Sequence, residues 1–185
     1  MTDRDIAYLP LDEIQPDSRN PRAHRSIGDV REAVEYLGFI EPIVRDERTG
    51  RLVAGHGRVE VLTAMHAAGQ DPPDGVRAEN GRWLVPVVVG WGSRSDDDAA
   101  RALVVLNHTT ETGGWDEYAL AELLTQLKQE TEVGFTATGF RDTDLDAILA
   151  KLAQVQAPED FPEFDENIDT EHKCPSCGYE WSGGT

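Results

Sequence analysis

Cysteine and long apolar runs are both scarce in this sequence of 185 residues, which holds only two cysteines. No apolar run approaches the roughly 20 residues that a membrane-spanning helix requires. The first residues, Met1 to Asp5, lack the pattern of a signal peptide. Two cysteines without an export signal favour a reducing compartment over a disulfide-stabilised fold. We therefore expect a soluble, cytoplasmic protein with no membrane partner.

Positive charge is also scarce, and the deficit is concentrated in one half of the chain. The net charge is −18, and residues 96–185 hold 5 Lys or Arg against 20 Asp or Glu. Because phosphate contacts supply most of the affinity for duplex DNA, this balance opposes nonspecific DNA binding by the chain as a whole. The N-terminal part alone could present a positive surface to DNA, through Arg19, Arg22, His24, Arg25, Arg31, Arg45, Arg48, Arg51 and Arg58.

A glycine turn is the most informative motif. An apolar run at 52–54 predicts a strand, the pattern at 59–68 predicts a helix, and Gly55, His56, Gly57 and Arg58 stand between them. Glycines at a strand-to-helix turn let backbone N–H groups approach a ligand, and a helix N-terminus favours an anion. Arg58 so close to that N-terminus is unfavourable unless an anion lies between them. The turn therefore predicts a phosphate site.

The rest of the pattern predicts short strands interspersed with helices. Helix periodicity after Ser26, a typical N-cap residue, ends at Gly38. Pro86 suggests that its strand lies at a sheet edge, because proline cannot donate to a ladder. The expected strands are at 6–14, 42–45, 52–54 and 83–89, and the expected helices at 30–37, 59–68, 99–106, 115–130 and 145–155.

The order of these elements resembles the ParB N-terminal domain, which shares its fold with sulfiredoxin. The residues that carry the resemblance are Asn20-Pro21-Arg22, Gly38-Phe39-Ile40-Glu41-Pro42-Ile43-Val44 and Ala54-Gly55-His56-Gly57-Arg58. The resemblance implies an α+β fold with a small mixed sheet and flanking helices at 1–107. The segment 108–156 resembles the helical extension of ParB-like proteins from phages and mobile elements. An acidic linker at 157–171 and a Cys-x-x-Cys tail at 172–185 complete the expected organisation.

The resemblance also implies a nucleoside triphosphate, CTP or ATP, bound with Mg²⁺ at the glycine turn. Its phosphates would contact Gly55, Gly57 and Arg58, with Arg22 as a second contact to phosphate or DNA and Asn107 near the nucleotide. The side chain of His56, within the same turn, could also donate to phosphate. No cysteine lies in the turn, which excludes sulfiredoxin chemistry, and His56-Gly57 replaces the charged residues usual in ParB. The function expected is nucleotide binding in the DNA metabolism of a phage or mobile element, in partition, modification or regulation.

Two alternative functions remain open. His56 and Glu41 are candidate catalytic residues, since an imidazole and a carboxylate could serve a metal-dependent nuclease or an ATP-dependent kinase of a small molecule. Against this, His56 could be an exposed turn residue, Glu41 a solvated glutamate, and Arg58 simply the ion-pair partner of Glu41 or Glu60. The second alternative is an acidic interaction protein that dimerises through zinc.

Cys174 and Cys177 form half of a zinc knuckle, with two thiolates on one tight turn. A structural zinc site needs four ligands. His172 could add a third, or a second copy of the tail could supply two more thiolates and make a homodimer. The alternatives are free thiols and one half of a longer ribbon.

Overall fold

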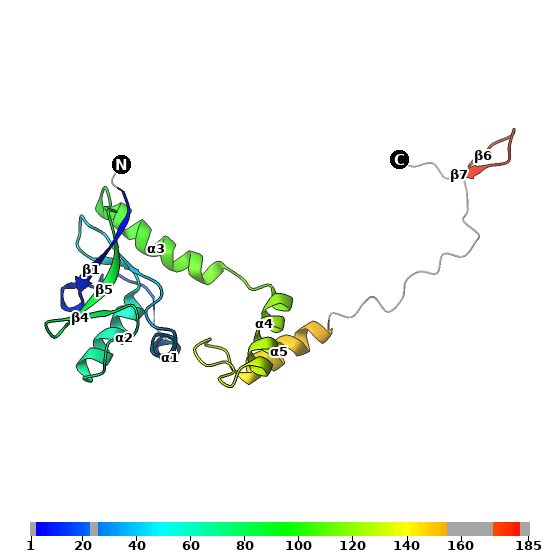
Figure 1. Ribbon diagram of the computed structural model, residues 1–185. Coiled ribbons are helices and arrows are strands. Elements are labelled where there is room, and N and C mark those ends of the chain that lie inside the picture. The colour runs from blue at the N-terminus through cyan, green and yellow to red at the C-terminus, as the bar shows by residue number, and fades with distance from the viewer. Residues whose placement is uncertain (1–2, 23–25, 155–171, 182–185) are drawn as a thin grey trace. The chain divides into compact units, whose positions relative to one another are not determined.

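The computed structural model describes residues 3–22, 26–154 and 172–181. The chain divides into two compact units, Met1–Leu152 and Ala153–Thr185. The first unit is built around a mixed five-stranded sheet (Figure 1). Its strands lie in the order β1 (Asp5–Pro10), β5 (Arg82–Val89), β2 (Ile43–Arg45) and β3 (Leu52–Ala54). The strand β4 (Arg77–Glu79) also pairs with β5. The pair β2–β5 is parallel and the other pairs are antiparallel. The fold is thus the small mixed sheet with helices that the sequence predicts.

One face of the sheet packs against α1 (Ile27–Leu37) and α2 (His56–Ala67). Alternating strand residues point to opposite faces, so Leu52 joins this core whereas the next residue, Val53, is buried outside it. The fully buried members Ile43, Leu52, Leu62, Val85 and Val87 form the centre of the core. This packing fixes the junction between β3 and α2, where the glycine turn lies.

A buried carboxylate holds the β2–β3 turn against the segment that follows β5. Asp46 is 0% exposed and accepts hydrogen bonds from the Arg48 N–H (3.1 Å), Thr49 Oγ1 (2.8 Å), the Ser93 N–H (2.8 Å) and Ser93 Oγ (2.7 Å). Burial alone would raise the pKa of Asp46, but the hydrogen bonds from Ser93, Thr49 and Arg48 together outweigh it and lower that pKa. The ionised Asp46 therefore ties two segments 47 residues apart in sequence.

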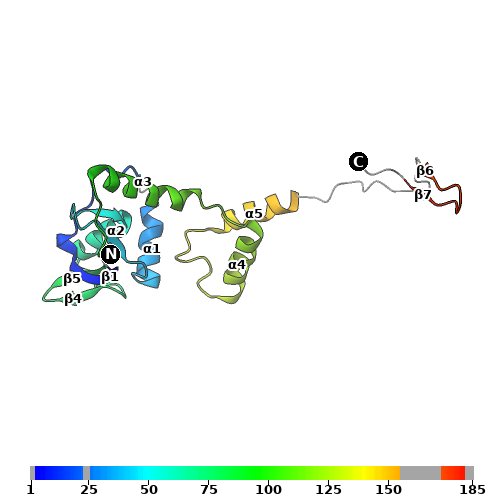
Figure 2. The same ribbon diagram turned by 90° about the horizontal axis from the view of Figure 1, so that it is seen from above.

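The helix α3 (Asp96–Thr112) begins shortly after Ser93, the partner of Asp46, and packs against β3. Ser95 caps its N-terminus by accepting from the Asp98 N–H at 3.2 Å, and three aspartates in the first turn suit the helix dipole. The helices α4 (Glu117–Glu130) and α5 (Asp142–Gln154) lie side by side (Figure 2). A smaller apolar cluster, with Leu120, Leu124 and Leu145 buried, joins them. No helix in the described residues is long and apolar enough to cross a membrane.

Several sequence-based boundaries are corrected by the structure. The first strand ends at Pro10 and continues as a short 3₁₀ helix, Leu11–Glu13. The helix predicted to start at Val59 begins at His56, and the one predicted to end at 106 continues to Thr112, so that residue 107 lies within α3. The prediction of an edge strand at Pro86 is wrong, because β5 lies between β1 and β2. On the side of β2, Pro86 has no ladder partner, because β2 pairs only with Val87 and Val88, whereas on the side of β1 it lies opposite Tyr8.

The second unit contributes a hairpin of β6 (His172–Lys173) and β7 (Glu180–Trp181), with both cysteines in the connecting turn. The backbone N–H groups of Ser176 and Cys177 donate to the Cys174 sulfur, which lowers the pKa of that thiol. The predicted acidic linker at 157–171 lies outside the described residues.

Candidate functional site

The glycine turn between β3 and α2 has the geometry of an anion-binding helix terminus. Gly55 occupies the left-handed region at φ +94° and ψ 18°, and its carbonyl accepts the Val59 N–H at 3.0 Å to open the helix. Gly55 is the N-cap and has no side chain that could accept from the first-turn N–H groups. His56, Gly57 and Arg58 form that first turn. Backbone N–H groups and the positive end of the helix dipole are thus available to a ligand.

We predict that Gly55→Ala lowers stability by several kcal/mol, more than the ~1 kcal/mol expected from backbone strain at positive φ alone. A Cβ at this position would overlap Cγ2 of Ile43, a fully buried residue that cannot move aside easily. Gly50 is the matched control, since it also has positive φ (+70°) but a Cβ there meets nothing within 4 Å. Urea denaturation of both variants measures the difference. Equal losses for both would contradict the close packing of the turn on Ile43.

Arg58 is held close beside this turn. Its side chain is 18% exposed, forms an ion pair with the Glu41 carboxylate, and donates from Nη1 to the Glu41 carbonyl at 2.7 Å. Burial lowers the pKa of Arg58, and the charge of Glu41 offsets part of that effect. The structure thus shows the ion pair with Glu41 that was one alternative for Arg58. Because the Glu41 side chain is 76% exposed, an incoming anion can replace it without burying a charge.

His56 is buried, at 9% exposure, rather than an exposed turn residue. Its Nε2 accepts the backbone N–H of Asp17 at 3.2 Å. A nitrogen that accepts carries no proton, so His56 in this state is neutral and protonated on Nδ1. This hydrogen bond joins the glycine turn to the loop that contains Asn20-Pro21-Arg22.

Asp17 anchors that loop and is a residue that the sequence analysis did not single out. Its side chain is 4% exposed and accepts from Arg19 Nε (3.0 Å) and Nη2 (2.7 Å), with Arg51 Nη1 at 3.7 Å. The Arg19 hydrogen bond lowers the pKa of Asp17 to about 2, against the effect of burial. The sequence signal that could have pointed to Asp17 is an Asx turn, in which the Arg19 N–H donates to Asp17 Oδ1 at 2.9 Å.

Asn107 brings α3 to the same loop. Its Nδ2 donates to Asn20 Oδ1 at 3.1 Å and to the Leu103 carbonyl at 2.8 Å. The Asn20 oxygen also accepts a hydrogen bond from the Arg22 N–H at 3.4 Å. The Arg22 side chain itself is exposed. Hydrogen bonds through Asp17 and Asn20 therefore connect the glycine turn, the Asn-Pro-Arg loop and α3, three segments far apart in sequence.

Most arginines of the predicted DNA surface are engaged by carboxylates. The ion pairs are Arg19 and Arg51 with Asp17, Arg31 with Glu35, Arg48 with Asp96, and Arg58 with Glu41. Arg22 makes no ion pair with any described residue, and Nε of the half-buried Arg45 is buried without a hydrogen-bond partner there. His24 and Arg25 lie outside the described residues. The positive charge available for a ligand is thus smaller than the sequence suggests.

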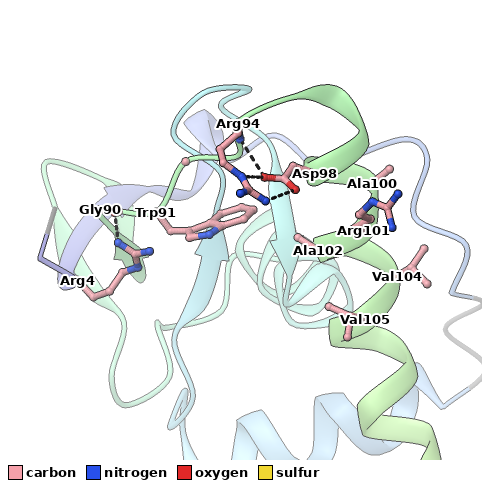
Figure 3. A pocket seen from close by; sticks show the side chains of 11 residues that line it. Arg4, Gly90, Trp91, Arg94, Asp98, Ala100, Arg101, Ala102, Val104 and Val105 are labelled. Carbon is pink, nitrogen blue, oxygen red and sulfur yellow. Dashed lines mark hydrogen bonds and ion pairs between the residues drawn. The ribbon is translucent and has the colours of Figure 1, made fainter. Parts of the chain in front are cut away.

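A hollow of about 850 Å³ lies on another part of the first unit (Figure 3). Arg94, which pairs with Asp98, and Trp91 line it together with Val104 and Val105 of α3. No residue of the glycine turn lines it. This hollow is separate from the site built on Gly55 and Arg58.

Comparisons with known proteins connect this geometry to a fold. No family model matches the sequence, and no curated protein matches it. One similar solved structure is the C-terminally truncated chromosome-partitioning protein ParB from Caulobacter crescentus, complexed with CTP-gamma-S. The similarity has a TM-score of 0.55 and 18% sequence identity, and it covers 80% of this chain and 79% of that chain. A Pnob8-like ParB-N domain gives a TM-score of 0.40 and 12% identity, over 84% and 64%.

The resemblance inferred from the sequence and the similarity found in three dimensions agree. The Asn-Pro-Arg loop, the mixed sheet and the glycine turn occur in the predicted order, and they lie where hydrogen bonds join them. The chain has the fold of the ParB N-terminal domain.

Proposed function

We propose that the chain binds a nucleoside triphosphate with its phosphates on the Gly55–Arg58 turn. The observation that carries the proposal is a largely buried guanidinium, Arg58, held beside a helix N-terminus whose N-cap is glycine. A cation at that end of a helix is unfavourable without an anion, and Glu41 supplies only an exposed one. The ParB of the same fold complexed with CTP-gamma-S supports a triphosphate as the ligand.

The proposal assigns a role to each residue around the glycine turn. Phosphate oxygens accept hydrogen bonds from the N–H groups of the first turn of α2, and they replace the Glu41 carboxylate as the partner of Arg58. Arg22, exposed on its loop, supplies a second contact to phosphate or DNA, and Asn107 contacts the nucleotide. His56 holds the turn to the Asp17 backbone, and we assign it a positioning role. Mg²⁺ would be held by the phosphates and one carboxylate, as it prefers, and Glu41 is the carboxylate at hand.

Thermal unfolding with CTP, ATP, GTP and UTP, each with MgCl₂, tests the proposal. A ligand that binds only the folded state raises the apparent stability by about 2.7 kcal/mol at 100 times its Kd. One or more triphosphates should therefore raise Tm, and the ranking identifies the base. If no triphosphate shifts Tm or gives heat in calorimetry at millimolar concentration, the proposal is wrong.

We predict that Glu41→Gln tightens triphosphate binding several-fold in the absence of Mg²⁺. The substitution removes the anion that competes with phosphate for Arg58. It leaves no buried carboxylate without a partner, because the Glu41 side chain is mostly exposed. Glu35→Gln is the control, since Glu35 pairs with Arg31 at 2.8 Å on α1 and should leave affinity unchanged. Calorimetry with and without Mg²⁺ measures both. Weaker binding without metal would overturn the competing role of Glu41.

We further propose that the chain acts in the DNA metabolism of a phage or mobile element. It rests on the ParB-like fold, on the exposed Arg22 and on the helical extension after the domain. DNA binding, if carried by this surface, has to work with the few arginines not already paired to carboxylates. The nuclease and kinase alternatives remain predictions based on His56 and Glu41.

A further inference from the structure

The hairpin of the second unit places its two cysteines together. The Cys174 N–H donates to the Tyr179 carbonyl at 2.7 Å, and the Gly178 N–H donates to the Cys174 carbonyl at 2.9 Å. These bonds fold Cys174-Pro175-Ser176-Cys177 into a tight turn that carries both free cysteines. Two sulfurs are thus held within reach of a single ion.

A Cys-x-x-Cys turn of this kind presents two thiolates to one metal ion. The arrangement is suited to a soft, tetrahedral cation such as Zn²⁺.

These 185 residues supply two thiolates, whereas a structural zinc ion takes four ligands. Among the described residues, no group of three or more His, Cys, Asp or Glu side chains is placed so that it could hold a metal ion. His172 contacts the ring of Trp181, with 5.6 Å between ring centroids. A second copy of the hairpin can supply two further thiolates.

We propose that two copies of this chain share one Zn²⁺ through Cys174 and Cys177 of each. Formation of the site releases up to four thiol protons as four Zn–S bonds form, so zinc affinity falls with decreasing pH. The sulfurs are neither oxidised nor reduced in this step. The site is independent of the nucleotide proposal, because it uses no residue of the first unit.

The exposed aromatic rings of the hairpin support a paired arrangement. Tyr179 is 68% and Trp181 42% exposed, and their rings stack with 6.2 Å between centroids. A two-stranded hairpin of this size is marginal in water by itself. Pairing around a metal would cover these rings, and the metal would supply the folding free energy that the hairpin lacks.

The test uses the full 185-residue chain, reduced with a phosphine, loaded with ZnCl₂ and dialysed. We expect 0.5 zinc per chain by elemental analysis, and twice the 20.4 kDa chain mass by light scattering. Cobalt substitution should give the visible spectrum of a tetrahedral site with four thiolates. Cys174→Ser and Cys177→Ser should each abolish metal retention, whereas Ser176→Ala, which keeps both thiols and the backbone donors, should not.

Two results would overturn the proposal. One is a metal content of one ion per chain, or a cobalt spectrum with fewer than four thiolates. The other is a fully reduced wild-type chain that retains no zinc. The far-UV circular dichroism spectrum of Cys174→Ser serves as the folding control, and it should match that of the wild-type chain.

Discussion

Arg58→Ala should reduce triphosphate affinity by roughly 10- to 150-fold, because a hydrogen bond between charged groups contributes about 1.5–3 kcal/mol. The side chain is the largely buried cation beside the turn, so no neighbouring charge in the first turn of α2 replaces it. Its partner Glu41 is mostly exposed, and the substitution therefore leaves no buried carboxylate behind. Titration calorimetry with the triphosphate that binds the wild-type chain best measures the loss.

Two further variants make this result specific. Arg58→Lys keeps the charge but loses the planar donor fork, and it should bind with intermediate affinity. Arg82→Ala removes an exposed arginine that pairs with Asp12 at 2.7 Å and Glu13 at 2.8 Å, and it should bind as the wild type does. If Arg58→Ala binds as well as Arg82→Ala, the phosphates do not lie at this turn.

Asp46→Ala should lower the free energy of unfolding by roughly 3–5 kcal/mol, a large part of the 5–15 kcal/mol that a typical domain possesses. The substitution leaves the Ser93 N–H, Ser93 Oγ, the Arg48 N–H and Thr49 Oγ1 without their acceptor, and the two bonds from Ser93 are buried. The attachment of the loop before α3 to the β2–β3 turn is lost with them. Urea denaturation at pH 7 measures the effect.

The same carboxylate makes stability dependent on pH. Its folded-state pKa is lowered, so its contribution is present above the unfolded-state value of about 3.9 and is lost as pH falls through the folded-state value. The difference between wild type and Asp46→Asn should therefore shrink below about pH 4. Asp12→Ala, at an exposed ion pair, is the control and should lower stability far less, because exposed ion pairs contribute little. Equal losses for Asp46→Ala and Asp12→Ala would contradict the structural role of Asp46.

The parts of the site that sequence alone predicted are those fixed by local backbone geometry. A glycine between an apolar strand and a helix signals positive φ, and Gly55 indeed has φ +94°. The helix around Arg58 and the loop at Asn20 follow from turn and capping residues in the same way. These requirements act over a few residues, which is the range in which single-sequence patterns are informative.

The parts that were missed depend on contacts between distant residues. Pro86 suggests an edge strand by its chemistry, but its strand is central, and the short strand β2 pairs only with Val87 and Val88. The Asp17 link to His56 spans 39 residues, and the Asp46 link to Ser93 spans 47. The apolar pattern of α3 ends at Leu106, yet no glycine or proline breaks the helix before Gly113. The apolar pattern therefore does not give the full length of this helix.

The helix α3 is pinned at two points, and this restricts how its length can vary. Near its start, Asp96 accepts from Arg48 at 2.7 Å, and further along Asn107 meets Asn20 at 3.1 Å. Each residue of an α-helix advances about 1.5 Å and rotates about 100°. One residue inserted or deleted between these points would turn Asn107 away from its partner, whereas point substitutions on the exposed side would not. Natural length variation should therefore fall after Asn107, toward the glycines at 113 and 114.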